Sequence, residues 1–391
     1  MLLIIIRELA KVSWVVIIPE LSKSSNLFLL YFFSLQLIFA IVQGSLSDHF
    51  CRKKSLIICF AAISIGQIFL FGALKWSWLL WIGLGIDGCL GNVPPIARAA
   101  LVETGFLNNP KKALGLSFAV LAPPWIMSIF LPQVQATYLI LTVFGLLILG
   151  LFLTICLFKD ERDLDPHRHL SMLKSTTYNY KGIKKIAPFF KWLSGFAKTE
   201  LKGIFKAFLL RAVFLIYISF IISQTAYEII FYYLDFVNIR EEEAIIILIM
   251  LIAFMIGSLT QVFTKCNQGK AILLGYALSA LSIPVGYFVS FLPLPPFLMK
   301  IALYGPITFA AGFYIPAIYS WVSLKYQAHH RGKVLGILDS IQTLGDMLGA
   351  FVLSIWQLKN FFYEEVPSAI FFVVAFYLFY RTFKMKKSSQ S

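Results

Sequence analysis

Blocks of about 20 consecutive apolar residues recur along the whole chain, and they constrain its fold more than any other feature. A helix needs about that length to cross the roughly 30 Å hydrocarbon core of a bilayer. Hydrocarbon offers no partner to backbone N–H and C=O groups, so each block is expected to be an α-helix. The composition agrees, because 59% of the 391 residues are hydrophobic and only 14% are charged, compared with about 25% charged in soluble domains. The sequence therefore predicts an all-α, multi-pass membrane protein.

We interpret these blocks as twelve transmembrane helices, six in each half of the chain. Their expected ranges are 2–19, 25–46, 55–74, 77–101, 113–132, 135–158, 207–234, 244–264, 269–291, 297–322, 333–357 and 364–381. The expected domains are an N-terminal six-helix bundle at 1–158, a cytoplasmic central loop at 159–206, a C-terminal six-helix bundle at 207–382 and a cytoplasmic tail at 383–391. Apolar residues at helical spacing between lysines in the central loop predict an amphipathic helix on the membrane surface. A solvated basic linker is the alternative.

The net charge of +15 could indicate nucleic acid binding, but its distribution indicates a membrane topology instead. Lys and Arg are concentrated in the loops on one side of the predicted bundle, and short positive loops stay in the cytoplasm. These loops carry Arg52, Lys53, Lys54, Lys111, Lys112, Lys265, Lys270, Lys325, Arg331 and Lys333, whereas the opposite loops carry Lys23, Lys75, Arg240, Lys300 and Lys359. We therefore expect both termini in the cytoplasm, a plasma or bacterial inner membrane location, and no nucleic acid partner.

The two halves of the chain resemble each other in sequence. Residues 44–52 read GSLSDHFCR and residues 257–265 read GSLTQVFTK, 213 positions later. A second set of matches, 221 positions apart, pairs Gly91, Pro95, Lys112, Leu114 and Gly115 with Gly312, Pro316, Lys333, Leu335 and Gly336. Six spans per half preserve the direction of the chain, so these are parallel repeats. Solute carriers with such repeats bind their substrate between the two halves.

Residues 44–54, which read GSLSDHFCRKK, resemble the signature G-x-x-x-D-[RK]-x-G-[RK]-[RK] of the major facilitator superfamily. They lie after the second span, where that family carries the signature. The resemblance implies the family's fold, with twelve transmembrane helices in two pseudo-symmetric six-helix bundles. The sequence departs from the signature at His49, where a basic residue is usual, and at Cys51, where glycine is usual.

The resemblance also implies a gating motif. Gly44 would allow close helix approach, and Asp48 would meet the positive N-terminal end of the eleventh helix. Arg52 would pair with Glu103 at the end of the fourth helix. Arg98, near the same end of that helix, is expected to act in the gate as well.

In that family the first, fourth, seventh and tenth helices line the central cavity, and charged residues in hydrocarbon are costly enough to be functional candidates. The candidates for substrate binding or coupling are Arg7, Glu8, Asp87, Asn92, Gln224, Glu228 and Tyr304, together with Asp346 of the eleventh helix. A mixed-charge cavity suits a small polar organic solute, with an arginine holding a carboxylate or phosphate. Glu228 or Asp87 is the candidate to carry a coupled proton. Two alternatives remain: Arg7 and Glu8 lie near the membrane surface, and Asp346 serves helix packing.

We therefore expect a secondary active transporter that works by alternating access and is coupled to a proton or another cation. The sequence contains no P-loop, G-x-S-x-G or H-E-x-x-H, so it shows no ATPase or hydrolase signature of those kinds. We expect neither enzyme activity nor a cofactor. His167 and His169 lack a third ligand at a suitable spacing, so no metal is expected. The expected partners are a small-molecule solute and the lipid bilayer, and we expect a monomer.

Other functions remain open. A non-transporting sensor or scaffold could use the same fold. A drug/proton exporter is less favoured, because Leu121-Ala122-Pro123-Pro124 in the fifth span lacks the glycines that follow in the family's antiporter signature. A membrane-embedded lipid enzyme would need a His/Asp/Ser group at a headgroup surface, and the sequence shows none.

Overall fold

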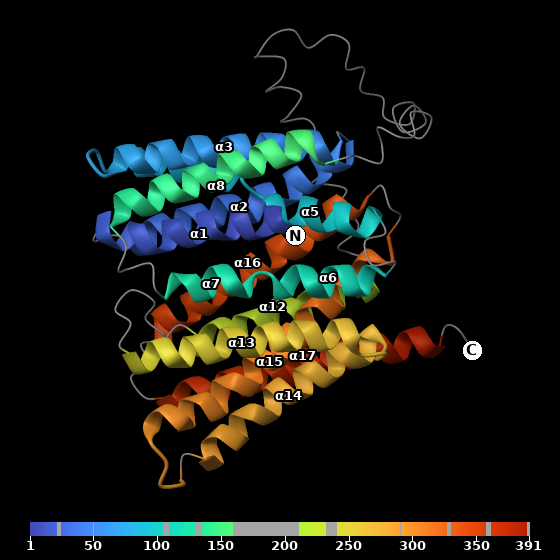
Figure 1. Ribbon diagram of the computed structural model, residues 1–391. Helices are drawn as coiled ribbons and strands as arrows, with labels where there is room; N and C mark the ends of the chain where they lie inside the picture. Colours follow the sequence, from blue (N-terminus) through green and yellow to red (C-terminus); the bar gives the residue numbers. More distant parts are fainter. Residues whose placement is uncertain are drawn as a thin grey trace.

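The computed structural model describes residues 1–21, 25–49, 51–104, 109–129, 135–158, 211–231, 241–289, 291–326, 330–356 and 361–388. Within these ranges, fourteen α-helices are the regular elements. Figure 1 shows them packed side by side as a bundle with roughly parallel axes. Such a bundle is what a bilayer requires, because each helix pairs its own backbone groups internally.

The first half of the chain contributes eight of these helices. They are α1 (Leu2–Leu21), α2 (Ser25–His49), α3 (Arg52–Ala73), α4 (Leu79–Leu90), α5 (Val93–Glu103), α6 (Pro110–Ala119), α7 (Ala122–Ser128) and α8 (Ala136–Cys156). The second half contributes the other six. They are α12 (Arg211–Phe231), α13 (Glu241–Phe263), α14 (Gln268–Val289), α15 (Pro296–Ser323), α16 (Arg331–Trp356) and α17 (Phe361–Ser388).

Two of the predicted spans are interrupted in the middle. The ranges 77–101 and 113–132 were expected to be continuous, but the first is divided into α4 and α5 and the second into α6 and α7. A pair of prolines lies in the first turn after each break, Pro94–Pro95 and Pro123–Pro124. Proline has no N–H to donate and its ring clashes with the carbonyl four residues earlier, so a helix restarts there. Counting each divided pair as one span, the fourteen helices make the twelve predicted spans.

Hydropathy and length agree with a multi-pass membrane protein. Seven helical segments of the described chain are long and apolar enough to cross a bilayer: Leu30–Asp48, Arg52–Ala73, Leu79–Glu103, Ala136–Cys156, Ala244–Phe263, Gln268–Val289 and Phe297–Ser323. The remaining helices include α1, which carries Arg7, Glu8 and Lys11, and α16, which carries Asp339 and Asp346. Charged residues lower the mean hydropathy of these two helices, so they are the spans in which function is to be sought.

The hydrophobic core has two parts. One cluster gathers residues of α1 to α5 and α8, and the other gathers residues of α12 to α17. The second cluster also takes in Leu114 and Phe118 of α6 and Ala99 and Val102 of α5. In addition, α2 packs along α16, and α6 packs against α13 and α15. Helices from the two halves of the chain are therefore in direct contact. The proposed domain division stays a prediction, since the central loop at 159–206 lies outside the described residues.

Close packing of α13 on α15 depends on glycine in both helices. A Cβ atom added to Gly257 would overlap the carbonyl oxygen of Phe309, and one added to Gly312 would overlap that of Phe254. These contacts are with backbone atoms, so a side chain there cannot be accommodated by a change of rotamer. Small residues serve the same purpose at many membrane helix interfaces.

This packing predicts that Gly257→Ala destabilises the protein by about 1–3 kcal/mol, because α13 and α15 must separate to admit the methyl group. The matched control is Gly145→Ala in α8, where an added Cβ would have nothing within 4 Å. That change should be neutral or stabilising, since alanine is the better helix former by about 1 kcal/mol. Thermal unfolding of the detergent-solubilised protein measures both variants. Equal Tm values for the two would contradict the close approach.

Candidate functional site

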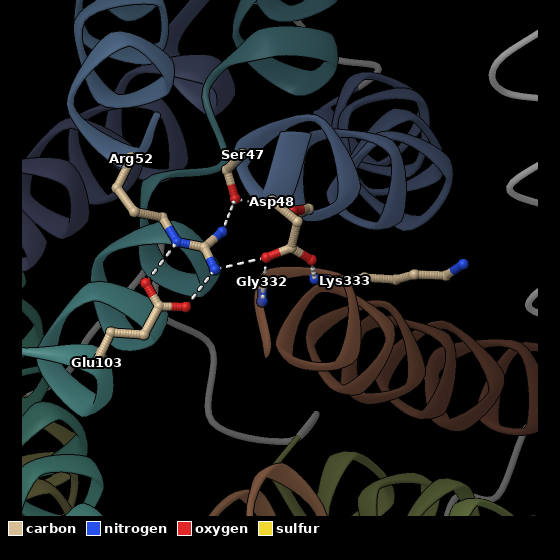
Figure 2. A network of polar contacts seen from close by, with 7 residues as sticks. Ser47, Asp48, Arg52, Glu103, Gly332 and Lys333 are labelled. Carbon is tan, nitrogen blue, oxygen red and sulfur yellow. Dashed lines mark hydrogen bonds and ion pairs between the residues drawn. The ribbon is translucent and has the colours of Figure 1, made fainter. Parts of the chain in front are cut away.

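The end of α2 is joined to the start of α16 by a carboxylate. Oδ1 of Asp48 accepts a hydrogen bond from the backbone N–H of Gly332 at 2.9 Å, and Oδ2 accepts one from the N–H of Lys333 at 2.7 Å (Figure 2). The first N–H groups of a helix have no partner within it, and they carry the positive end of the helix dipole. Asp48 therefore caps a helix from the other half of the chain. This is the contact that the sequence predicted for Asp48.

Arg52, the first residue of α3, connects Asp48 to α5. Its Nη2 lies 2.5 Å from Oδ1 of Asp48 and 2.5 Å from Oε1 of Glu103, and its Nε donates to Oε2 of Glu103 at 3.1 Å. Its Nη1 donates to the hydroxyl of Ser47. The guanidinium is buried with two carboxylates around it, and charge-assisted pairs of this kind are the strong ones. The Arg52–Glu103 pairing was predicted, but the part of Ser47 was not. We call this group, with the N–H groups of Gly332 and Lys333, the Asp48 network.

Glycine is required where the Asp48 network crosses between α2 and α16. A Cβ atom on Gly332 would overlap the Arg52 guanidinium and would lie 2.6 Å from both the carbonyl oxygen of Gly44 and Oγ of Ser47. A Cβ on Gly44 would in turn overlap the carbonyl of Gly332. The close approach predicted for Gly44 is therefore present, and its partner is Gly332.

A second ion pair links α5 to α16. Nη1 of Arg98 donates to Oδ1 of Asp339 at 2.8 Å, and the hydroxyl of Tyr319 donates to the same oxygen at 2.5 Å. The guanidinium of Arg98 also stacks over the ring of Phe118, with 4.0 Å between its central carbon and the ring centroid. Arg98 was expected to act in the gate. Its partner Asp339 lies in the other half of the chain, and Tyr319 was not predicted from the sequence.

A third ion pair lies inside the first half. Nη2 of Arg7 in α1 lies 2.7 Å from Oδ1 of Asp87 in α4, and Nε1 of Trp14 donates to Oδ2 of Asp87 at 2.7 Å. Arg7 is 1% exposed and Asp87 is 0% exposed. The alternative that Arg7 and Glu8 lie near the membrane surface concerns their depth in the bilayer, and it stays a prediction. Both residues face the interior, where Arg7 is stabilised by a carboxylate; the sequence did not reveal that Trp14 shares this carboxylate.

The remaining interior charges come from both halves. Glu8 of α1 accepts a hydrogen bond from Nε1 of Trp125 in α7 at 3.3 Å. Lys11 lies over the ring of Phe33 at 5.3 Å, and it is close enough to Glu228 of α12 and Asp346 of α16 for the charges to attract. These two acids are neighbours on packed helices. Asp346 lies about one turn before Gly349 in α16, and a Cβ atom added to Gly349 would lie 2.5 Å from Cβ of Glu228. Lys11, Glu228 and Asp346 thus form a charged set that spans the two halves.

The other candidates make contacts of their own. Nε2 of Gln224 donates to the hydroxyl of Tyr314 at 3.3 Å. Asn92 occupies the break between α4 and α5, where its backbone N–H donates to Gln43 at 2.9 Å. Tyr304 belongs to the second core cluster. In the described part of the chain, no group of three His, Cys, Asp or Glu side chains is arranged to hold a metal ion.

A family model described as Major Facilitator Superfamily matches residues 9–350. The chain belongs to the major facilitator superfamily. Members of this superfamily are transport proteins rather than enzymes, and the Asp48 network is this chain's form of the family signature. A search of curated proteins by sequence found no match.

Several solved structures of superfamily members share the fold. The transporter FucP in the outward conformation has a TM-score of 0.72 at 14% identity, with 97% of each chain covered. The human organic anion transporter MFSD10 has a TM-score of 0.71 at 14% identity, again with 97% of each chain covered. The proton:xylose symporter XylE, bound to 6-bromo-6-deoxy-D-glucose, has a TM-score of 0.66 at 13% identity, with 97% of this chain and 95% of the other covered. Identities this low show that the fold is shared and leave the substrate open.

The Arg7–Asp87 pair predicts a non-additive response to mutation. Arg7→Met alone should destabilise the protein by about 3–5 kcal/mol, because it leaves a buried carboxylate without its counter-charge. Adding Asp87→Asn should recover much of that loss, since the amide oxygen still accepts from Trp14 while no lone charge remains. Thermal or denaturant unfolding of the four proteins of this double-mutant cycle tests it. Single-variant losses that simply add in the double variant would contradict a direct pair.

Proposed function

We propose that this protein is a secondary active transporter that moves a small polar organic solute by alternating access, coupled to a proton or another cation. The observation that carries this proposal is the charged set of Lys11, Glu228 and Asp346. It joins the two halves at helices that cross hydrocarbon. Ionisable residues are costly there, so they mark candidate functional sites. Transporters with parallel repeats bind solute and coupling ion at this interface.

The ion pairs narrow down which interior charges remain for the solute. Arg7 is held by Asp87, and Arg98 is held by Asp339. An arginine was expected to hold the solute's carboxylate or phosphate, but both arginines already have a carboxylate partner in this conformation. We therefore assign the contact with an anionic group of the solute to Lys11. Gln224 and the two acids supply hydrogen bonds and attraction for its polar or cationic parts.

Coupling is assigned to Glu228 and Asp346. The acids Glu8, Glu228 and Asp346 outnumber Lys11, so bound positive charge reduces an excess of negative charge in the interior. Two neighbouring carboxyls titrate as a pair, so one proton can be shared between them. A proton or other cation is therefore the natural partner of the solute in each transport cycle.

The experiment for this proposal is transport by purified protein in proteoliposomes with an imposed pH gradient. The panel should contain amino acids, nucleosides, osmolytes and drugs, with hexoses, pentoses and organic anions added because the similar structures FucP, XylE and MFSD10 are named for such solutes. Accumulation of one class of solute that collapses with the gradient is the expected result. Absence of flux across the whole panel would instead favour a non-transporting sensor or scaffold, and flux confined to drugs would favour a drug/proton exporter.

Substitution of the acids should separate coupling from movement of the solute. For a solute that accumulates, Glu228→Gln and Asp346→Asn should abolish uphill accumulation while exchange of solute between the two sides persists. The control is Glu228→Asp, which keeps a carboxyl group and should retain at least part of the accumulation. Counterflow and pH-driven uptake in the same proteoliposomes measure the two activities. If both amide variants accumulated solute as the wild type does, these acids would not carry the coupling ion.

The orientation in the membrane is part of the same proposal. We place the Asp48 network, the central loop and both termini on the cytoplasmic side of a plasma or bacterial inner membrane, in keeping with the basic loops. Cysteines introduced at Lys54 and Lys265 should then react with an impermeant maleimide only from the cytoplasmic side. A cysteine at Ser77, in the α3–α4 turn, should react only from outside. Labelling of positions 54 and 265 from opposite sides would contradict the parallel-repeat architecture.

A further inference from the structure

Proline lies at the same place in the fourth span of each half, which is α4 with α5 in the first half and α15 in the second. Pro95 and Pro316 correspond at an offset of 221. Each follows a glycine by four residues, Gly91 in α4–α5 and Gly312 in α15. Proline has no N–H for the carbonyl four residues before it. Hydrocarbon offers no water to such a carbonyl, so another protein group has to replace the missing donor.

In the second half a serine replaces the missing donor. The helix α15 is continuous although Pro316 lies inside it. Oγ of Ser258 in α13 donates to the carbonyl oxygen of Gly312 at 3.1 Å. Ser258 is fully buried, and the close packing of α13 on α15 at Gly257 brings its hydroxyl within reach (Figure 1). The hydrogen bond that Pro316 removes is thus replaced from the neighbouring helix.

In the first half the span is broken, and two backbone groups need new partners. The first part, α4, ends at Leu90, and α5 begins at Val93. The N–H of Val93, which a continuous helix would give to Cys89, donates to the carbonyl of Gly91 at 2.9 Å. The carbonyl of Cys89 and the N–H of Asn92 therefore fall at the break, outside the regular helical pattern.

A single glutamine side chain bonds to both of these groups. Nε2 of Gln43 in α2 donates to the carbonyl oxygen of Cys89, and its Oε1 accepts the N–H of Asn92 at 2.9 Å. The thiol of Cys59 in α3 donates to the same Oε1, with 3.7 Å between sulfur and oxygen. Gln43 is itself buried. Its amide takes the place of a peptide group in the broken span.

The side chains that replace these bonds differ between the halves as the spans do. At an offset of 213, Ser258 corresponds to Ser45, and Gln43 corresponds to Ile256. Isoleucine has no side-chain donor or acceptor, and the continuous α15 needs no amide at that place. The form of the span and the polar residue of the neighbouring helix therefore change together.

The two spans carry side chains that meet at one carboxylate. Arg98 and Tyr319 each lie seven residues beyond the glycine of their span, and they correspond at the same offset of 221. Both donate to Oδ1 of Asp339, at 2.8 Å and 2.5 Å. Phe118, the counterpart of Asp339 in the repeat, packs against both, with its ring centroid 4.0 Å from the Arg98 guanidinium and 4.8 Å from the Tyr319 ring. A change in direction of either span would move a donor away from Asp339.

We propose that Gln43 and Ser258 are positioning residues for the two fourth spans. Each supplies, from a neighbouring helix of its own half, hydrogen bonds that the prolines remove from the span. Each thereby fixes the direction of the part that follows, and with it the place of Arg98 or Tyr319 beside Asp339. The inference goes beyond the proposed function, since it concerns the shape of the spans and not the solute.

The first test asks whether the prolines create the need for Gln43. Gln43→Leu alone should lower the Tm of the detergent-solubilised full chain by about 5 °C, because two buried backbone groups lose their partner. With Pro94→Ala and Pro95→Ala the helix can continue through the break, so adding Gln43→Leu should shift the Tm by about 1 °C or less. Gln43→Met, which keeps the length of the side chain without the amide, is measured beside it.

Ser258→Ala should behave in the same way with Pro316→Ala, because an alanine at that position restores the missing donor. Two residues serve as matched controls. Gln36 is a second buried glutamine of α2, and Ser279 is a buried serine whose hydroxyl bonds within its own helix, α14. The Tm shifts of Gln36→Leu and Ser279→Ala should be the same with and without the prolines.

The second measurement tests position rather than stability. Spin labels are placed on cysteines at Ile82 in α4 and Thr104 just after α5, both exposed, in the full chain in nanodiscs. The native cysteines that are partly or fully exposed, Cys89, Cys156 and Cys266, are first replaced by serine. Pulsed electron spin resonance should give a distance distribution about twofold wider in Gln43→Leu than in the parent, and a narrow one again when both prolines are alanine. Gln36→Leu should match the parent.

The outcomes decide each role separately. A Tm shift of Gln43→Leu that is equal with and without the prolines, an unchanged distance distribution, or failure to fold in both backgrounds would overturn the role of Gln43. Folding only in the background without prolines would support it. Equal shifts of Ser258→Ala with and without Pro316 would overturn the role of Ser258. Neither measurement needs a transported solute, so a failure of the proposed function would leave both results standing.

Discussion

Hydrocarbon gives a polar group no partner, and the structure depends on that constraint at every level. It forces the backbone into helices, and it allows the chain to interrupt a span only where protein surrounds the break. Both interruptions, before Pro94 and before Pro123, lie within the bundle rather than at its ends. The same constraint acts on side chains, because the buried arginines Arg7, Arg52 and Arg98 each have a carboxylate within 2.8 Å. Glu8, Glu228 and Asp346 have only Lys11 as a counter-charge among the residues discussed above, and we place the transported ion at Glu228 and Asp346 for that reason.

The polar contacts between the halves include two at helix ends, where backbone groups have no partner within the helix. Asp48 uses the first N–H groups of α16, and Lys111 uses carbonyls beyond the end of α13. Such contacts are directional and depend on one or two atoms, so they break completely when helices separate by a few ångström. Hydrophobic contact along α2 and α16 changes more gradually with distance. A transporter that must open and close can therefore change its state at these contacts while its helices stay intact.

The helical fold and the family could be predicted from the sequence because both depend on local patterns. Length and hydropathy identified the spans, and the tract at Gly44–Arg52 identified the signature. The sequence did not predict the breaks in two spans, although a Pro-Pro pair follows each one, because the apolar sequence continues through both breaks. It also left the place of Arg7 open between the membrane surface and the interior. Only the tertiary structure shows that its partner is Asp87, 80 residues away.

The sequence by itself determined that the chain crosses a membrane as helices, that its halves are repeats, and that Asp48, Arg52 and Glu103 belong together. These features follow from segment length, from self-similarity and from a motif that is contiguous except for one residue. Only the tertiary structure decided which charges neutralise each other, and so which remain for a solute or an ion. It also showed that the ammonium group of Lys111 in α6 donates to backbone carbonyls just beyond the end of α13. Pairings of this kind depend on which helix faces lie opposite each other, and that is set by packing over the whole bundle rather than by any local pattern.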